Sequence, residues 1–324
     1  MAAPCPPPEP FETGILDTGE GHRIYWERCG TPGGRPAVAL HGGPGSGASP
    51  RLRRLFDLER YCLTLFDQRG CGRSRPHAAE TLAALEANTT RHLIADIERL
   101  RARFGLARWL VFGGSWGATL ALAYARAHPS AVAALVLAGV TTTSRAEIEW
   151  LYGGAGARRP EAFAAFRAAA PEAEPGLALV AAYARRLQDP DPGTHRAAAA
   201  AWCAWEQALA EPDPATPPSP RWSDPAFRLA FTRLVTHYFG HLAWLAAAPI
   251  LPPDPGLAAI PAWLVQSRGD LAAPAATAEA LHAALPLSRL ALLDGTVHAA
   301  SGRGMAEATT AATGAALRDP SLRW

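Results

Sequence analysis

The chain has 324 residues, 49% of them hydrophobic and 19% charged, which is enough to bury a sizeable core in one large α/β domain or two units. Its formal net charge of +2 gives no field that favours a nucleic-acid or anionic-membrane partner. The sequence contains arginine but no lysine, which excludes Schiff-base catalysis and the lysine of a phosphate-binding loop.

Short apolar runs alternate with helical segments along the first part of the chain. Strands are predicted over residues 22–30, 36–40, 61–66, 108–112 and 131–139, and helices over residues 91–105 and 116–128. In the first helix Leu93, Ile97 and Leu100 share one face, and Gly105 ends the segment. This alternation predicts a mostly parallel sheet with right-handed crossovers.

The middle of the chain has a different character. Residues 141–245 are rich in Ala, Arg, Trp and Pro and contain helix-like runs without a convincing strand. Strands are again predicted over residues 261–266 and 288–294, with helices over residues 275–285 and from about Gly304. We therefore predict an α/β class fold, in which a core of residues 1–140 and 246–324 carries a helical cap domain over residues 141–245.

The cysteines and the N-terminal residues bear on the cellular location of the protein. The five cysteines are odd in number and form no C-x-x-C pair, which is typical of reduced thiols and not of a disulfide framework or zinc site: Cys5, Cys29, Cys62, Cys71 and Cys203. Residues 1–10 lack the features of a secretory signal and are predicted to be a loose tail. No apolar run approaches the roughly 20 residues that span a bilayer. We expect a cytoplasmic protein without a metal or other cofactor.

A sharp turn between a predicted strand and helix carries the motif G-x-S-x-G, here GGSWG. Glycines at positions 113 and 117 permit a strained turn and a close backbone approach that a Cβ would obstruct, so that Ser115 is lifted above the sheet edge as a nucleophile. The N–H of Trp116, at the helix N-terminus, faces the position of a developing oxyanion.

A second glycine-rich turn follows the predicted buried strand 36–40. Its sequence, His41-Gly-Gly-Pro-Gly, offers another oxyanion donor, for which Gly43 is the candidate. His41 precedes the nucleophile and lies inside this turn, so we expect it to hydrogen-bond structurally and not to act as the base.

A serine nucleophile needs a base, and the base needs an orienting acid. With this kind of turn the acid and then the histidine follow the serine, each on a loop after a strand. Asp270 and His298 fit that order. Asp294 is the alternative acid, but it lies only four residues before His298 on the same loop and is assigned to the turn into Gly295.

Together, HGGPG, DQRGCGRS (residues 67–74), NTT, DIERLR and GGSWG resemble the proline iminopeptidases, or prolyl aminopeptidases, of the α/β-hydrolase superfamily. In the predicted cap, AWCAWE and THYF are similar to segments of the same family. The resemblance implies the α/β-hydrolase fold and release of an N-terminal proline from peptides or proline amides through an acyl-enzyme intermediate, without a metal. In DQRGCGRS we expect Asp67 to pair with Arg69, and Cys71 to confer sensitivity to thiol reagents without being catalytic.

The predicted cap carries the candidate substrate-binding residues. A buried substrate amine needs a carboxylate counter-charge, and Glu206 matches the amine-binding glutamate of the family; the alternative is an exposed helix residue. Phe239 and Tyr152 are candidate pocket walls, or else belong to the cap core. Two positions depart from the family pattern: Val235 replaces a second glutamate, and Thr141 replaces a pocket aromatic.

Three functional hypotheses follow. The first is a prolyl aminopeptidase-like serine hydrolase, which acts on small peptides as a monomer or small homo-oligomer. The second keeps the same triad but hydrolyses a small amide, ester or thioester, as the two departures suggest. The third is a non-enzymatic binding protein, which predicts a broken triad that the sequence does not show.

Overall fold

The computed structural model describes residues 8–210, 219–295, 298 and 304–324. Within these residues one sheet has eight strands in the spatial order β1-β2-β4-β3-β5-β6-β7-β8. The strands are β1 (Glu12–Asp17), β2 (Arg23–Gly30), β3 (Arg35–Leu40), β4 (Tyr61–Phe66), β5 (Trp109–Gly114), β6 (Val132–Ala138), β7 (Ala262–Ser267) and β8 (Ser288–Leu293). β2 runs antiparallel to β1 and β4, and the remaining neighbours are parallel. The predicted mostly parallel sheet is confirmed, and β1 is an addition to it.

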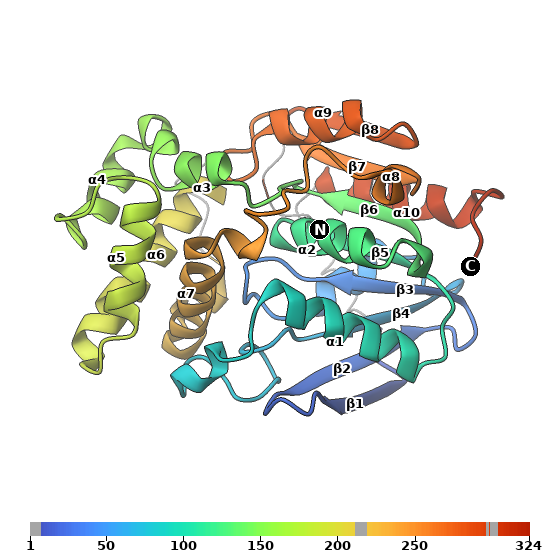
Figure 1. The fold of residues 1–324 in the computed structure, drawn as a ribbon, viewed down its shortest axis with the longest axis horizontal. Coiled ribbons are helices and arrows are strands. Elements are labelled where there is room, and N and C mark those ends of the chain that lie inside the picture. The colour runs from blue at the N-terminus through green and yellow to red at the C-terminus, as the bar shows by residue number, and fades with distance from the viewer. Residues whose placement is uncertain (1–7, 211–218, 296–297, 299–303) are drawn as a thin grey trace, which may run out of the picture.

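Helices cover both faces of the sheet (Figure 1). Alternate residues of β3 separate the two hydrophobic cores: Val38 and Leu40 face one core, and Ala37 and Ala39 face the other. The first core is closed by α1 (Thr90–Arg103), α2 (Trp116–Ala127), α8 (Pro255–Ala258) and α9 (Ala275–Ala284). The second core is closed mainly by α10 (Met305–Arg318).

A group of five helices lies beyond the carboxyl ends of the parallel strands, at the left of Figure 1. They are α3 (Arg145–Leu151), α4 (Pro160–Ala168), α5 (Leu177–Leu187), α6 (Pro192–Ala210) and α7 (Pro225–Gly240). We call them the cap helices. The described residues between 141 and 245 contain no strand, while the exact domain boundaries stay a prediction.

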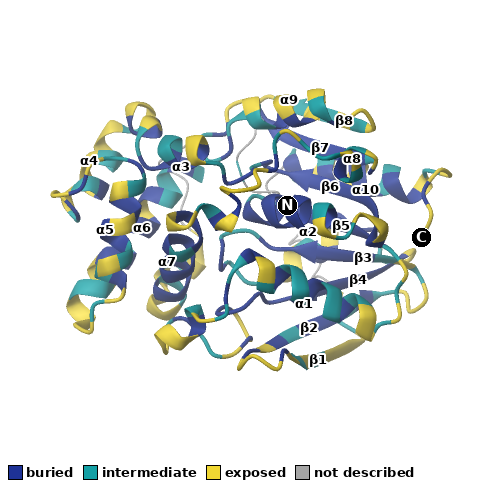
Figure 2. Ribbon diagram, viewed as in Figure 1, coloured by how far each residue is buried: buried dark blue, intermediate teal, exposed yellow. Residues whose placement is uncertain are grey.

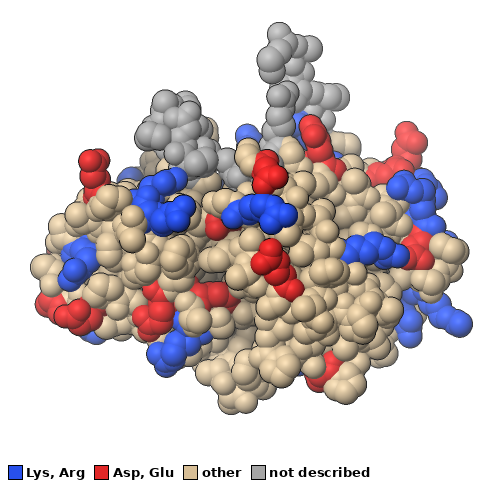
Figure 3. Space-filling view, turned by 90° about the horizontal axis from the view of Figure 1, so that it is seen from above, with Lys and Arg blue, Asp and Glu red and all other residues tan. Residues whose placement is uncertain are grey.

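Burial follows this layered arrangement. The central strands are dark blue in Figure 2, whereas β1 and the outer sides of the cap helices are exposed. Acidic and basic side chains are interspersed on the face drawn in Figure 3. No helix in the described ranges is long and apolar enough to cross a membrane. Four of the cysteines are free and buried, and Cys5 lies outside the described residues.

Candidate active site

Ser115 lies on the turn between β5 and α2, with the left-handed backbone angle φ of 55°. Its backbone N–H donates to the carbonyl of Ala138 in β6 at 2.9 Å. A Cβ on Gly113 would lie 2.1 Å from the carbonyl oxygen of Gly117, and a Cβ on Gly117 would lie 2.2 Å from that of Leu40. Because both contacts are with backbone, only glycine permits this crossing of strand and helix.

His298 joins Ser115 to Asp270. The Ser115 hydroxyl lies 2.9 Å from His298 Nε2, and His298 Nδ1 donates to Asp270 Oδ2 at 2.7 Å. The other carboxylate oxygen of Asp270 accepts the N–H groups of Ala272 and Ala273, each at 2.9 Å. These bonds hold the acid in one orientation beside the imidazole.

The alternative acid points elsewhere. Asp294 keeps 85% of its side-chain surface exposed and lies 3.4 Å from Arg268. The side chain of Asp270 is fully buried. The geometry therefore favours Asp270 as the partner of His298.

The charge environment of His298 favours the imidazolium. Burial by itself lowers the pKa of His298, but the charge and hydrogen bond of Asp270, and the charge of Glu206, raise it above its ordinary value. A histidine that accepts a proton from serine becomes an imidazolium, so this environment stabilises the protonated intermediate.

Two residues that the sequence analysis did not single out shape this arrangement. Gln266, fully buried in β7, donates from its amide to Asp270 Oδ2 at 3.3 Å and accepts the N–H of Val140 at 2.7 Å. Gly139, with φ of 59°, leaves room for the imidazole, since a Cβ there would lie 3.3 Å from His298 Cε1. Gly139 directly follows β6, and Gln266 lies one residue before the end of β7, the next strand of the sheet. This position near the carboxyl end of a strand is the only local signal that either residue carries.

The HGGPG turn is held by hydrogen bonds to DQRGCGRS. His41 Nε2 accepts the backbone N–H of Gln68 at 3.0 Å, so Nδ1 carries the proton and donates to the carbonyl of Gly42 at 2.9 Å. That carbonyl belongs to the peptide that bears the N–H of Gly43. The Gln68 side chain donates to the carbonyl of His41 and accepts the indole N–H of Trp116. Burial lowers the pKa of His41, which is consistent with a neutral, structural histidine.

Glu206 on α6 faces a group of aromatic side chains. Its Oε1 accepts the hydroxyl of Tyr152 at 2.8 Å and the indole N–H of Trp202 at 3.0 Å. The Tyr152 ring lies 4.6 Å from Trp202 and 6.2 Å from Phe239. Burial raises the pKa of Glu206, and its charge acts on His298. Glu206 is therefore not a solvated helix residue, and a carboxylate lies close to the reacting groups.

The two departures from the family pattern are both accommodated structurally. Val235 is completely buried in α7. The Thr141 hydroxyl donates to Glu147 Oε1 at 3.0 Å, and the same carboxylate accepts the hydroxyl of Thr277 on α9 at 2.9 Å. Thr141 thus belongs to a polar junction between α3 and the core.

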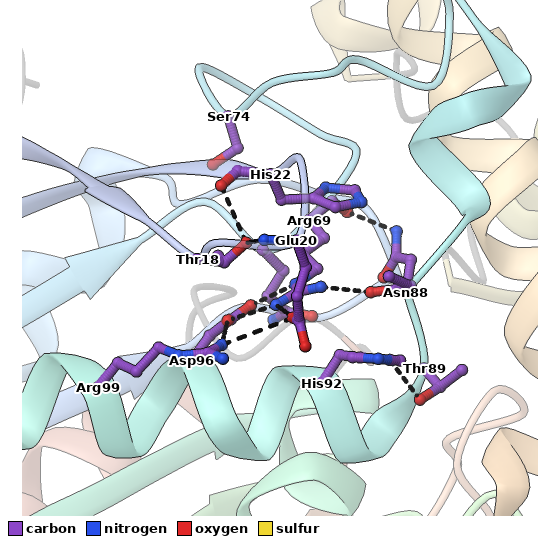
Figure 4. A network of polar contacts seen from close by, with 12 residues as sticks. Thr18, Glu20, His22, Arg69, Ser74, Asn88, Thr89, His92, Asp96 and Arg99 are labelled. Atoms are coloured by element: carbon purple, nitrogen blue, oxygen red, sulfur yellow. Dashed lines mark hydrogen bonds and ion pairs between the residues drawn. The ribbon is translucent and has the colours of Figure 1, made fainter.

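The predicted pairing of Asp67 with Arg69 is wrong. Asp67 pairs with Arg73 at 2.7 Å, while the buried guanidinium of Arg69 pairs with Asp96 on α1 at 2.6 Å (Figure 4). The cause is the turn at Gly72, where the chain folds back so far that a Cβ would lie 2.5 Å from Asp67 Cγ.

Cys71 lies in the same turn. It is only 1% exposed, and burial raises its pKa well above the ordinary value of a thiol. Since the thiolate is the reactive form, these features argue against the predicted sensitivity to thiol reagents.

Comparisons with known proteins identify the family of this chain. A family model described as "alpha/beta hydrolase fold" matches residues 36–301, so fold and sequence define an α/β hydrolase. A probable proline iminopeptidase of Streptomyces coelicolor is 46% identical over 310 residues, covering 94% of this chain and 95% of the relative. A proline iminopeptidase of Arabidopsis thaliana is 43% identical over 301 residues, covering 92% of this chain and 78% of the relative. The chain belongs to the proline iminopeptidase family.

Solved structures support the fold alone. The crystal structure of a proline iminopeptidase from Mycobacterium smegmatis superposes with a TM-score of 0.62 at 20% identity, over 94% of this chain and 97% of that one. An esterase from Exiguobacterium antarcticum gives the same TM-score of 0.62 at 18% identity, over 94% of this chain and 99% of that one.

Proposed function

We propose that this protein is a prolyl aminopeptidase in which Ser115, His298 and Asp270 are the catalytic triad. The observation that carries the proposal is the bridging position of His298, with one ring nitrogen 2.9 Å from the Ser115 hydroxyl and the other 2.7 Å from Asp270. The names of the relatives supply the substrate class.

The geometry suggests the following steps. Ser115 Oγ attacks the scissile carbonyl carbon while His298 Nε2 takes its proton and Asp270 stabilises the imidazolium. His298 then donates that proton to the leaving amine, and prolyl-Ser115 remains. His298 then takes a proton from a water molecule, whose oxygen attacks the acyl carbon. The intermediate collapses as His298 returns this proton to Ser115 Oγ, which releases proline and restores the free enzyme.

The oxyanion of each tetrahedral intermediate is assigned to the N–H groups of Gly43 and Trp116. The hydrogen bond from His41 to the Gly42 carbonyl orients the first peptide, and the start of α2 orients the second. Removing such a donor typically costs ~2.7–4 kcal/mol of transition-state stabilisation.

Substrate selection is assigned to the cap helices. Glu206 supplies the negative charge that a buried prolinium amine requires, and Phe239 forms a wall for the ring. The prediction of Tyr152 as a second wall is wrong, because its side chain is fully buried in the aromatic core of the cap. Tyr152 instead positions the amine-binding carboxylate through its hydrogen bond to Glu206 Oε1. We further propose that the substrates are small peptides and that the protein is a cytoplasmic monomer or small homo-oligomer.

A second candidate keeps the triad but hydrolyses small amides, esters or thioesters. It is favoured by the buried, apolar Val235, where the family resemblance implies a second carboxylate. One carboxylate binds an amine less strongly than two.

A substrate panel separates the two candidates. Proline p-nitroanilide, its N-acetyl derivative and p-nitrophenyl acetate are compared at equal enzyme concentration. The aminopeptidase predicts hydrolysis of the first and strong discrimination against the N-acetyl derivative, which lacks the charged amine. Turnover of the acetate ester without release of p-nitroaniline from the free proline substrate would favour the second candidate.

A further inference from the structure

Helix α7 of the cap rests directly on two loops of the active site. Leu234 is 1% exposed and lies against both glycine turns. A Cβ on Gly45 of HGGPG would lie 2.8 Å from Leu234 Cδ1, and a Cβ on Gly70 of DQRGCGRS would lie 3.0 Å from Leu234 Cδ2. The side chain of Leu234 thus fills the space between the HGGPG turn, which carries Gly43, and the DQRGCGRS turn.

About one helical turn later, Tyr238 contacts the other oxyanion donor. Its ring centroid lies 4.8 Å from that of Trp116, at an interplanar angle of 57°. Its hydroxyl donates to Asn88 Oδ1 at 2.7 Å. Tyr238 therefore packs on the indole of Trp116 while its polar end is fixed elsewhere.

Asn88 is a rigid attachment point in the core. Its amide donates to the carbonyls of Ala84 at 2.8 Å and Arg69 at 3.2 Å, and the side chain is fully buried. Figure 4 shows Arg69 between Asn88 and Asp96 of α1. The guanidinium makes two bonds to Asp96, at 2.6 and 2.7 Å.

Other residues of α7 fix the helix to the core. Arg233 donates to the carbonyl of Ala78 in the core and to that of Leu187 in α5, each at 2.8 Å. His237 donates to the carbonyl of Asn88 at 2.9 Å. These contacts fix the position of α7 relative to both glycine turns.

We propose that Leu234 and Tyr238 are positioning residues for the oxyanion hole: Leu234 holds the HGGPG turn against DQRGCGRS, and Tyr238 holds Trp116. The inference rests on the proposed function, since it assigns the oxyanion to Gly43 and Trp116. Neither side chain needs to touch the substrate. Small displacements are costly, because a misplacement of about 1 Å can reduce the rate on the order of 100-fold.

The effect belongs to the transition state. The oxyanion exists only after attack by Ser115, so a displaced donor lowers kcat and leaves KM nearly unchanged. Loss of a binding residue such as Glu206 raises KM for amine substrates instead. The two roles are therefore separable by kinetics.

The test compares Leu234→Ala with Leu179→Ala, an equal truncation of a fully buried leucine in α5 of the cap. Leu234→Met restores the side-chain volume, and Tyr238→Phe removes only the bond to Asn88. The substrates are proline p-nitroanilide and p-nitrophenyl acetate, and a prolyl boronic acid serves as a tetrahedral mimic.

We expect Leu234→Ala to lower kcat about 10- to 100-fold for both substrates, with KM changed less than about 2-fold. The inhibition constant of the boronic acid should rise by a similar factor. Leu234→Met should recover most of the rate, Tyr238→Phe should lose about 3- to 10-fold in kcat, and Leu179→Ala should lower only the Tm.

Equal kinetic effects of Leu234→Ala and Leu179→Ala would overturn the inference, and so would a change in Leu234→Ala that is confined to KM. In either case, turnover of proline p-nitroanilide by the wild type would leave the proposed function intact. If Leu234→Ala does not fold, the test rests on Tyr238→Phe. An unchanged kcat together with an unchanged boronic-acid affinity in that variant would then overturn the inference. A wild type that hydrolyses neither substrate refutes the proposed function and this inference with it.

Discussion

His298 Nδ1 lies 2.7 Å from Asp270 Oδ2, and Asp270 is held by two backbone N–H groups on its other oxygen. Asp270→Asn should preserve this shape but favour the wrong imidazole tautomer, because an amide presents a donor as well as an acceptor. We expect kcat for proline p-nitroanilide to fall on the order of 10³- to 10⁴-fold. Asp294→Asn is the control and should retain activity; the reverse ranking of the two variants would reassign the acid.

Glu206→Gln tests the amine site and the pH dependence together. The loss of a charge-assisted contact of ~1.5–3 kcal/mol predicts a KM for proline p-nitroanilide raised about 10- to 150-fold. The charge of Glu206 contributes to the raised pKa of His298. Since His298 is active when neutral, activity on p-nitrophenyl acetate is lost as pH falls through its pKa, and this acid limb should move to lower pH in the variant.

The matched control for this variant is Glu161→Gln, an exposed glutamate on α4. It should change neither KM nor the acid limb of kcat/KM. An acid limb that stays in place in Glu206→Gln would show that the carboxylate does not act on His298.

Gly139→Ala should impair catalysis by displacing the imidazole. The added Cβ lies 3.3 Å from His298 Cε1, and φ at this position is 59°. We expect kcat to fall about 10-fold, with a loss of about 1–2 kcal/mol in the free energy of unfolding from the backbone strain. Gly33→Ala carries similar strain at φ of 80° without a neighbour within 4 Å, so it should lose stability but not activity.

The ion pair between Arg69 and Asp96 should be a major determinant of stability. Both side chains are fully buried, so Asp96→Asn leaves the guanidinium short of counter-charge. We expect a loss of about 3–5 kcal/mol in the free energy of unfolding, measured by urea denaturation. Glu20→Gln, which alters the partly exposed second partner of Arg69, should cost less than about 1 kcal/mol. Similar losses in the two variants would contradict this ranking.

The elements of the core could be predicted because their patterns are local. GGSWG needs its glycines for close contacts within one strand-helix turn and with the neighbouring β3. The sequence motif therefore predicts its own local structure. Asp270 and His298 could be placed from strand order alone. β1 escaped prediction because it is a polar edge strand whose residues are mostly exposed, so it shows no buried face.

The contacts that were predicted wrongly or not predicted at all join residues that are far apart in the sequence. Asp67 and Arg69 are neighbours in the chain, yet Arg69 pairs with a residue 27 positions away. The bond from Tyr238 to Asn88 spans 150 positions, and that from Val140 to Gln266 spans 126. Nothing in local periodicity indicates which polar group a buried amide or phenol meets across the fold.

The role of Ser115 as the nucleophile of a prolyl aminopeptidase is tested most directly by the release of p-nitroaniline from proline p-nitroanilide by the wild type and by Ser115→Ala at matched concentrations. We expect steady turnover by the wild type and a loss of at least about 10³-fold in the variant, with its folding intact by circular dichroism. Equal rates in the two proteins, or no release by the wild type, would contradict it.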